Sequence, residues 1–345
     1  MNIRVGILTA PHIDFEQREK TFILKNVRIG IGFHWDRHED QEFAGQLEIR
    51  NNPDGTQTAI NTIDLEDYLC SVISSEMNAN SPMELLKAHA VISRSWAIRA
   101  MQKPNHEGYD VCADDHCQRY EGLKRMNERA VEAVNATRGQ VLMYGDAVCD
   151  CRYYKCCGGK TEVWRTCWEE IDVPYIQSVS CDYCKSPSPK VLRLVLNDYD
   201  QETKDFRDWK VSYTQEELSE IIRTKSGIDF GDIIDLIPLH RGASGRIDSL
   251  KIVGTKHTEI IGKELKIRYW LSKSCLYSSW FEVEKSPITN HKSQMSNQFT
   301  LIGHGWGHGA GLCQIGAAVM ASEGHIYEEI LSYYYVGSRL SATAQ

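Results

Sequence analysis

The periodicity of apolar residues changes at Ile63, and this change constrains the fold more strongly than any other feature of the chain. Before it, residues 3–60 alternate short apolar runs with polar breaks, and the turn sequence Asn52–Gly55 separates two of these runs. Such alternation predicts strands joined by turns. After it, apolar residues follow the i, i+3, i+4 spacing of an amphipathic helix, at Leu65, Tyr68, Leu69, Val72 and Ile73.

A second helix is predicted from Ser81 to about Gln102. Ser81 is expected to be its N-cap, Pro82 its first helical residue and Glu84 the partner that completes a capping box. A third helix is predicted over residues 124–137, because the periodic pattern stops before a glycine.

The chain from residue 139 to about 283 is predicted to be mainly β, with one helical interruption near 214–224. Polar residues 284–297 are predicted to form a loop, and helices are predicted at 312–323 and 326–335.

Because strands and helices do not alternate as βαβ units, the predicted class is α+β. It has a helical core flanked by mainly antiparallel β segments, and it ends in a pair of helices. Residues 1–60 are predicted as an N-terminal β segment and 61–345 as the main domain. The β-rich stretch at about 190–290 is a candidate smaller subdomain.

The composition of the 345 residues excludes two classes of protein. A net charge of −8 argues against a nucleic-acid partner, which normally requires a basic surface. No stretch of about 18 apolar residues occurs, so no transmembrane segment is predicted. Residues 1–8 are too short and wrongly flanked for a signal peptide, and we expect them to form the first strand.

Glu76 is the candidate catalytic residue, because it lies on the apolar stripe of the first predicted helix. A carboxylate that faces apolar groups loses hydration, which favours the protonated form that a general acid needs. A solvated glutamate at a frayed helix end fits the same pattern equally well. Glu66 and Asp67 lie nearly three turns away, about 14 Å along a helix, too far to pair with Glu76.

Cysteine is abundant, with twelve residues at positions 70, 112, 117, 149, 151, 156, 157, 167, 181, 184, 275 and 313. The donor types of one short segment suit a structural zinc ion, namely His106, Cys112, His116 and Cys117. A Cys112–Cys117 disulfide and free thiols are the alternatives. The Cys181-x2-Cys184 pair fits either half of a zinc site or a disulfide cluster, and the two remain open.

Two long motifs at opposite ends of the chain resemble the SpoIID/LytB family. The first runs from Glu66-Asp67-Tyr68-Leu69 to Ser75-Glu76-Met77 and continues through Pro82, Ala88, Ala90 and Arg94. The second runs from Gly303 to Gly311 (Gly-His-Gly-Trp-Gly-His-Gly-Ala-Gly) and continues to Gln314 and Tyr334. Weaker similarity lies at Cys117–Tyr120, Gly158–Glu162 and Gly245–Ile247. The resemblance covers roughly residues 60–340.

The resemblance implies a lytic transglycosylase that acts on the glycan strands of peptidoglycan, with Glu76, before Met77, as catalytic residue. One carboxyl suffices in that chemistry, because the C6 hydroxyl of muramic acid attacks C1 and closes a 1,6-anhydro ring. The implied substrate-binding residues are Arg94, Gln118, Tyr120, Gly158, Gly159, His304, Trp306, His308 and Gln314. For Arg94 a surface role is the alternative, and for Trp306 a place in the core.

Some relatives bind zinc with such a loop, so one structural zinc at residues 106–117 is expected and no organic cofactor. The expected place is the cell envelope, outside the cytoplasm; an export leader is not among these residues. A cell-wall amidase is a candidate partner, because other relatives are amidase enhancers that bind glycan without cutting it. A zinc hydrolase built on His304 and His308 is a third hypothesis. The chain departs from the family at Cys156-Cys157, where many members have Ser or Thr.

Overall fold

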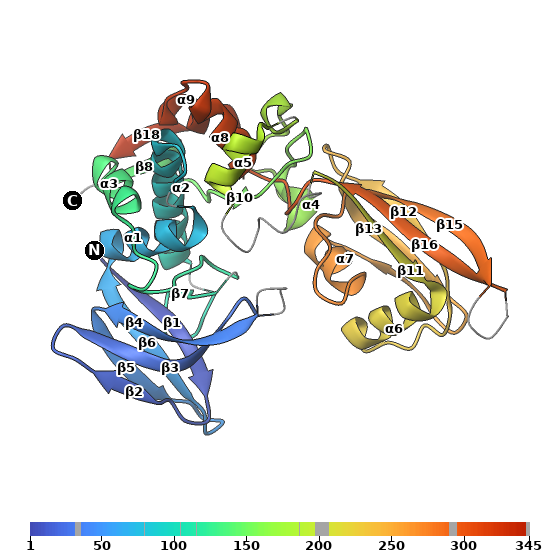
Figure 1. The fold of residues 1–345 in the computed structure, drawn as a ribbon, viewed down its shortest axis with the longest axis horizontal. Helices are drawn as coiled ribbons and strands as arrows, with labels where there is room; N and C mark the ends of the chain where they lie inside the picture. The colour runs from blue at the N-terminus through green and yellow to red at the C-terminus, as the bar shows by residue number, and fades with distance from the viewer. Residues whose placement is uncertain are drawn as a thin grey trace.

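The structure is a computed structural model that describes residues 1–31, 36–78, 80–103, 105–114, 116–185, 187–196, 207–289 and 295–342. Two hydrophobic cores organise these residues, and they correspond to the two lobes in Figure 1. The first core gathers apolar residues from the N-terminal strands, the helices that follow and the C-terminal helices. The second core lies within residues 209–301. The domain boundary at residue 60 stays a prediction.

Four small sheets belong to the first lobe. Their orders are β5-β6-β1-β7, β2-β3-β4, β18-β8-β9 and β10-β17. Among the described pairs of these sheets, β1 with β7 and β10 with β17 are parallel. The strands are β1 Asn2–Ala10, β2 Phe15–Gln17, β3 Thr21–Ile29, β4 Arg37–Ala44, β5 Gln46–Asn51, β6 Gln57–Asp64, β7 Val111–Cys112, β8 Gln140–Tyr144, β9 Ala147–Val148, β10 Tyr153–Tyr154, β17 Leu312–Cys313 and β18 Arg339–Ala342.

One long helix, α2, is central to the first lobe and contacts α1, α3, α8 and α9 (Figure 1). The helices of this lobe are α1 Leu65–Glu76, α2 Met83–Gln102, α3 Glu128–Ala136, α4 Trp164–Cys167, α5 Pro189–Val195, α8 Gln314–Ser322 and α9 Tyr327–Tyr334, with a 3₁₀ turn at Asp182–Cys184. None of the helices in the described part of the chain has the length and apolar character of a membrane span.

The second lobe contains two antiparallel sheets, β11-β16-β15 and β12-β13-β14, with α6 and α7 beside them. The elements are β11 Asp208–Thr214, α6 Gln215–Ser226, β12 Ile233–Arg241, β13 Ile247–Gly254, β14 Thr258–Ile261, α7 Glu264–Trp270, β15 Phe281–Thr289 and β16 Met295–His304. From the end of β16 the chain returns to the first lobe and enters β17 and α8 (Figure 1). The predicted α+β class, with mainly antiparallel sheets, is confirmed.

Local interactions explain where the key helix begins. The Asp64 side chain accepts a hydrogen bond from the backbone N–H of Glu66 and caps α1. The apolar stripe that the sequence predicts is buried, and Glu76 is the last residue of the helix. Glu76 itself is half-buried, so it lies where the buried stripe reaches the surface of the core.

The predicted capping box at α2 is wrong. The N-cap is Pro82 and no side chain caps the helix. The hydroxyl of Ser81 instead donates to the carbonyl of Leu194, a long-range contact. Glu84 accepts a hydrogen bond from the backbone N–H of Tyr327 and so holds the start of α9.

Two further predictions about the second half of the chain are corrected. Residues 284–289 and 295–297, predicted as loop, belong to the paired strands β15 and β16; residues 290–294 lie outside the described residues. These strand residues are mostly exposed, so their polar composition resembled that of a loop. The middle of the chain also contains α4, α5 and α7 besides the predicted helix, which is α6.

Candidate functional site

Glu76 is held at the C-terminal end of α1 by two hydrogen-bond donors. Its Oε1 atom accepts from the backbone N–H of Arg119 at 3.0 Å and from the phenol of Tyr153 at 3.1 Å. Both donors come from segments far from α1 in sequence. These two hydrogen bonds fix the orientation of the carboxyl group. A fixed orientation is what a catalytic group needs in order to reach one particular substrate atom.

Tyr153 is the donor that sequence reasoning missed, because neither periodicity nor a motif marks it. It lies on β10, which pairs in parallel with β17. Burial raises the pKa of its phenol well above the usual value, and the charge of Glu76 raises it further. The phenol therefore keeps its proton and donates it in the hydrogen bond to Glu76.

The ring of His89 packs against the ring of Tyr153. The two rings lie edge-on, with 4.4 Å between centroids. Burial lowers the pKa of His89 to about 3, and Lys155 lowers it further, so the ring is neutral. Its Nε2 accepts from the Gln314 amide at 3.1 Å, and its Nδ1 is 3.2 Å from the hydroxyl of Ser93. Gln314 was predicted to bind substrate, but it is 3% exposed and holds His89 instead.

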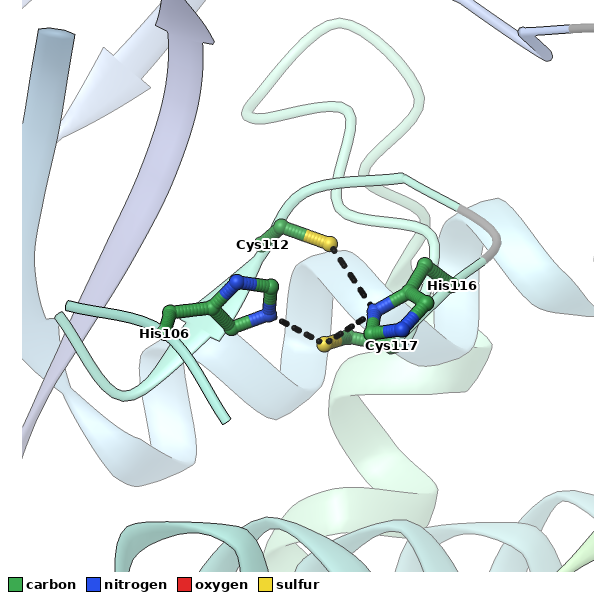
Figure 2. A group of neighbouring side chains, drawn as sticks. All are labelled: His106, Cys112, His116 and Cys117. Atoms are coloured by element: carbon green, nitrogen blue, oxygen red, sulfur yellow. Dashed lines mark hydrogen bonds between the residues drawn. The ribbon is translucent and has the colours of Figure 1, made fainter. Parts of the chain in front are cut away.

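The four predicted zinc ligands come together in one cluster. His106, Cys112, His116 and Cys117 each offer a donor atom, and all four donors lie within 4.8 Å of one another. Figure 2 shows the four side chains converging. His116 points toward the other three, although it is adjacent to Cys117 in sequence. The separations are 3.2 Å from His106 Nε2 to Cys117 Sγ, 3.6 Å from His116 Nδ1 to Cys117 Sγ and 4.0 Å from His116 Nδ1 to Cys112 Sγ.

These separations fit one tetrahedral ion. Bonds of about 2.3 Å to sulfur and 2.0 Å to nitrogen place neighbouring ligands roughly 3.3–3.8 Å apart. Hydrogen bonding between the two thiols lowers the pKa of Cys112 to about 4 and raises the pKa of Cys117, so without an ion one thiolate is favoured over two. The pKa of His116 is raised, chiefly by its hydrogen bond to the Cys112 sulfur. The donor set therefore suits zinc, and four protein ligands leave no open position on the ion.

The cluster is connected directly to Glu76. Two residues after Cys117, the backbone N–H of Arg119 donates to the Glu76 carboxylate. The position of this N–H therefore depends on the conformation of the loop that the four ligands close. A cavity of about 830 Å³ also opens beside the cluster, lined by His106, Cys112 and His116 together with residues of β1 and β3. Glu76 does not line it, so this cavity is a feature of the loop region.

Arg94 has a structural position. It is fully buried, and its Nη2 and Nε atoms bind both carboxylate oxygens of Glu66 at 2.7 and 2.9 Å. It also donates to the carbonyl of Gln140 at 3.1 Å. Its donors join α1, α2 and the start of β8, which is a stabilising role, and contact with substrate stays a prediction. It is not the surface arginine that was the alternative.

Gln118 and Tyr120 are also buried, each about 1% exposed. Gln118 accepts from the phenol of Tyr68 at 3.2 Å, and Tyr120 donates to Asn61 at 2.7 Å. Both side chains thus have partners within the protein, and their role in binding substrate stays a prediction. Gln118 and Tyr120 precede and follow Arg119 in sequence, and their buried side chains anchor this segment in the core.

The glycines of the 303–311 loop serve close packing within the protein. At Gly305, Gly307 and Gly309 φ is positive, and a Cβ atom would lie 2.6–2.8 Å from Cys156, Tyr154 and Arg246 respectively. The loop lies against β10 and the buried Arg246, whose Nε donates to the carbonyl of Gly307 at 3.1 Å.

His308 is occupied by protein groups on both ring nitrogens. Nε2 lies 3.0 Å from the carbonyl of Tyr153, and Nδ1 accepts from the N–H of Ala310 at 3.1 Å. Burial lowers its pKa well below the usual value, and nearby arginines lower it further, so the ring is neutral. Both ring nitrogens are thus used within the protein, and a direct role for His308 in binding glycan stays a prediction.

His304 and His308 have different partners, because Nδ1 of His304 pairs with Asp208 at 2.6 Å. The two histidines therefore do not form a metal pair. Three other predicted substrate residues keep partial exposure, namely Gly158, Gly159 and Trp306. The Trp306 backbone forms a two-way bridge with Cys156, and its ring lies 6.0 Å from the ammonium of Lys155. Of the predicted substrate residues, these three, His304 and His308 are the partly exposed ones.

Comparison with known proteins finds a family match in each half of the chain. Residues 53–144, which include Glu76 and the 106–117 cluster, match the family described as stage II sporulation protein. Residues 162–311 match a family described as a domain of unknown function.

Curated relatives cover most of the chain. An uncharacterised protein of Brachyspira hyodysenteriae is 29% identical over 297 residues, 86% of this chain and 71% of the relative. Stage II sporulation protein D of Bacillus subtilis is 28% identical over 298 residues, covering 82% of this chain and 76% of that protein. An amidase enhancer of Bacillus subtilis is 27% identical, covering 79% of this chain and 40% of that protein. The family match over residues 53–144 and these relatives support the similarity of the chain to the SpoIID/LytB family.

Proposed function

We propose that the protein is a lytic transglycosylase that cleaves the glycan strands of peptidoglycan. The observation that carries this proposal is Glu76, fixed at the end of α1 by the Arg119 N–H and the Tyr153 phenol. A mechanism in which one residue acts first as acid and then as base requires one carboxyl group that is half-buried and held in a fixed orientation.

The reaction uses Glu76 twice. Protonated Glu76 donates its proton to the glycosidic oxygen between muramic acid and glucosamine, and the C1–O bond breaks. The resulting carboxylate then takes the proton of the C6 hydroxyl of muramic acid, whose oxygen attacks C1. The products are a 1,6-anhydro end and a free 4-hydroxyl, and Glu76 is protonated again. Because the nucleophile belongs to the substrate, no water and no second carboxylate enter the balance.

The neighbouring acidic residues are engaged elsewhere, which supports a single-carboxylate mechanism. Glu66 is paired with Arg94, and Glu121 forms an ion pair with Arg125. Tyr153 and the Arg119 N–H hold the carboxylate after it has given up its proton, since both donate to it. The His and Cys cluster would hold a structural zinc, which would fix the loop that carries Arg119.

Digestion of purified peptidoglycan tests the proposal. Glu76→Gln removes the transferable proton and keeps the shape, so release of 1,6-anhydro products should fall by about 10³-fold or more. Asp67→Asn, an exposed carboxylate on the same helix, is the matched control and should leave the rate unchanged. Mass spectrometry distinguishes 1,6-anhydro ends from hydrolysed ends. Undiminished release by Glu76→Gln would overturn the assignment.

A second candidate function is that of an amidase enhancer, favoured by the similarity to the Bacillus subtilis protein of that name. In this case the protein binds glycan, Glu76 contacts it, and a cell-wall amidase is the partner. The wild-type protein would then release no anhydro products but would increase the rate of an added amidase. Both functions place the protein in the cell envelope, outside the cytoplasm, in keeping with the sporulation relatives.

A further inference from the structure

Four cysteines that the proposed function does not use meet in the first lobe. The Sγ atoms of Cys157, Cys181, Cys184 and Cys313 all lie within 4.8 Å of one another. All four side chains are fully buried, and all four thiols are free. They come from three separate places: the turn after β10, the 3₁₀ turn at Asp182–Cys184 and the last residue of β17.

The spacing suits a metal ion better than disulfide bonds. Cys157 Sγ and Cys184 Sγ are 3.1 Å apart, whereas a disulfide requires about 2.05 Å. A tetrahedral zinc ion with four sulfur ligands at about 2.3 Å separates the sulfurs by roughly 3.8 Å. A [4Fe–4S] cluster has four irons between its ligands and would keep the sulfurs considerably farther apart than one ion does.

Hydrogen-bond donors lie beside three of the four sulfurs, as they do around metal-bound thiolates, whereas Cys184 Sγ lies 3.5 Å from the carbonyl of Cys181. The N–H groups of Cys157 and Gly316 point at Cys313 Sγ, at 3.3 and 3.4 Å. The N–H of Gly159 donates to Cys157 Sγ at 3.3 Å. The phenol of Tyr334 lies 3.2 Å from Cys181 Sγ. A buried neutral thiol needs no such donors, whereas a thiolate is stabilised by each of them.

The surroundings fit the charge and the size of such a centre. One zinc ion with four thiolates carries a net charge of −2, and the buried guanidinium of Arg246 donates to the carbonyl of Cys157 at 3.3 Å. At Gly316 a Cβ atom would lie 2.7 Å from Cys181 Sγ and 2.3 Å from the Tyr334 oxygen. A side chain there would therefore displace a ligand, and glycine is the residue that leaves the four sulfurs in place.

We propose that Cys157, Cys181, Cys184 and Cys313 bind one structural zinc ion, separate from the 106–117 cluster. On binding, each thiol gives its proton to solvent, so that four protons leave as one Zn²⁺ enters. Because all four positions are filled by protein, the ion is structural.

This centre would fix the positions of β10 and β17, the strands that place Tyr153 beside Glu76. Cys157 follows β10, which carries Tyr153, and Cys313 ends β17, its partner strand. The next residue, Gln314, holds His89 against Tyr153. The 3₁₀ turn that carries Cys184 contacts α8, so the ion would join three segments that are up to 156 residues apart.

X-ray absorption at the zinc edge tests the proposal on the wild-type chain, purified under reducing conditions and supplied with zinc. Both centres together give a mean of three sulfurs and one nitrogen per zinc, and the four-cysteine centre alone gives four sulfurs. Either result supports the site. A mean of two sulfurs and two nitrogens, or a protein without zinc, would overturn it. So would peptide mapping that finds these four cysteines in disulfides in that sample.

Variants supply a second measurement. Cys181→Ser/Cys184→Ser should contain one zinc per chain fewer than the wild type. Cys275→Ser, a cysteine outside both clusters, should contain the same amount as the wild type. Equal zinc in the double variant and the wild type contradicts the proposal. If the double variant fails to fold, the absorption measurement on the wild type decides. Neither readout depends on cleavage of glycan.

Discussion

The phenol of Tyr153 donates a hydrogen bond of 3.1 Å to Oε1 of Glu76. Strand β10, which carries Tyr153, therefore orients the last residue of α1. If Glu76 acts as acid and then base, this donor matters most when the carboxylate is ionised. A hydrogen bond to a charged group contributes about 1.5–3 kcal/mol.

Tyr153→Phe should therefore lower kcat for anhydro product release roughly 10-fold to 100-fold. The pH profile of kcat should also move to higher pH, because the carboxylate loses a donor that favours its ionised form. Both are measured from product release across pH.

Tyr154→Phe is the matched control. Tyr154 is the next residue on β10, and its buried hydroxyl has no hydrogen-bond partner in the described part of the chain. Removing it should leave kcat and the pH profile unchanged. A Tyr153→Phe enzyme with an unaltered profile would show that the phenol does not act on Glu76.

Arg94 should matter for stability and not for substrate affinity. Arg94→Met keeps the volume of the side chain but leaves Glu66 without its partner, which should cost about 3 kcal/mol of unfolding free energy. Thermal and denaturant unfolding measure this loss, and KM for glycan should stay unchanged. Arg99→Met, on the last turn of the same helix, should have little effect on either. A higher KM with unchanged stability would return Arg94 to the substrate site.

The sequence predicted the elements that local pattern determines. The stripe from Leu65 to Val72 defines α1 and puts Glu76 at its end, because helical periodicity is a local property. The ligands His106 to Cys117 are within twelve residues of one another, so their clustering was also visible. Thr214 and Glu217 do form a capping box at α6, although the similar pattern at Ser81 does not.

Several side-chain contacts could not be predicted because the two partners are distant in sequence. Ser81 bonds to Leu194, Arg94 to Glu66 and His308 to Tyr153. Of the four-cysteine cluster, only Cys181 and Cys184 are close enough in sequence to appear as a pair. The contact of Tyr153 with Glu76 is visible only in the folded structure, because β10 and α1 are far apart in sequence.

The 106–117 cluster should hold one zinc ion that supports catalysis through Arg119. Cys112→Ser/Cys117→Ser should contain one zinc per chain fewer than the wild type, measured by metal analysis. Because the loop then no longer fixes the Arg119 N–H, kcat should fall as well, by roughly 10-fold for one hydrogen bond to a charged group.

Cys275→Ser is the control for the loss of a cysteine, and it should keep both zinc content and kcat. The comparison with the wild type is a difference of one ion, so it holds whatever the second cluster contains. Zinc content in Cys112→Ser/Cys117→Ser equal to that of the wild type would contradict this prediction.

Protonation of His89 should make the protein less stable below neutral pH. Its pKa is about 3 in the folded state and 6.5 ordinarily, because burial disfavours the charged ring. As the pH falls below about 6.5, the unfolded chain binds a proton that the folded protein rejects, and unfolding becomes easier. Between about pH 6 and pH 5, this residue should remove about 1 kcal/mol of unfolding free energy.

His89→Gln keeps a polar partner for Gln314 but cannot take up the proton. The loss of unfolding free energy between these two pH values, measured by denaturant unfolding, should therefore be smaller by about 1 kcal/mol in the variant than in the wild type. His308, whose pKa is also lowered, contributes a loss of the same sign in both proteins, so the difference isolates His89. His257→Gln, at an exposed position, should follow the wild-type dependence. If His89→Gln lost as much stability as the wild type, a protonated His89 would be compatible with the fold, and Tyr153 would be held by a charged ring instead of a neutral one.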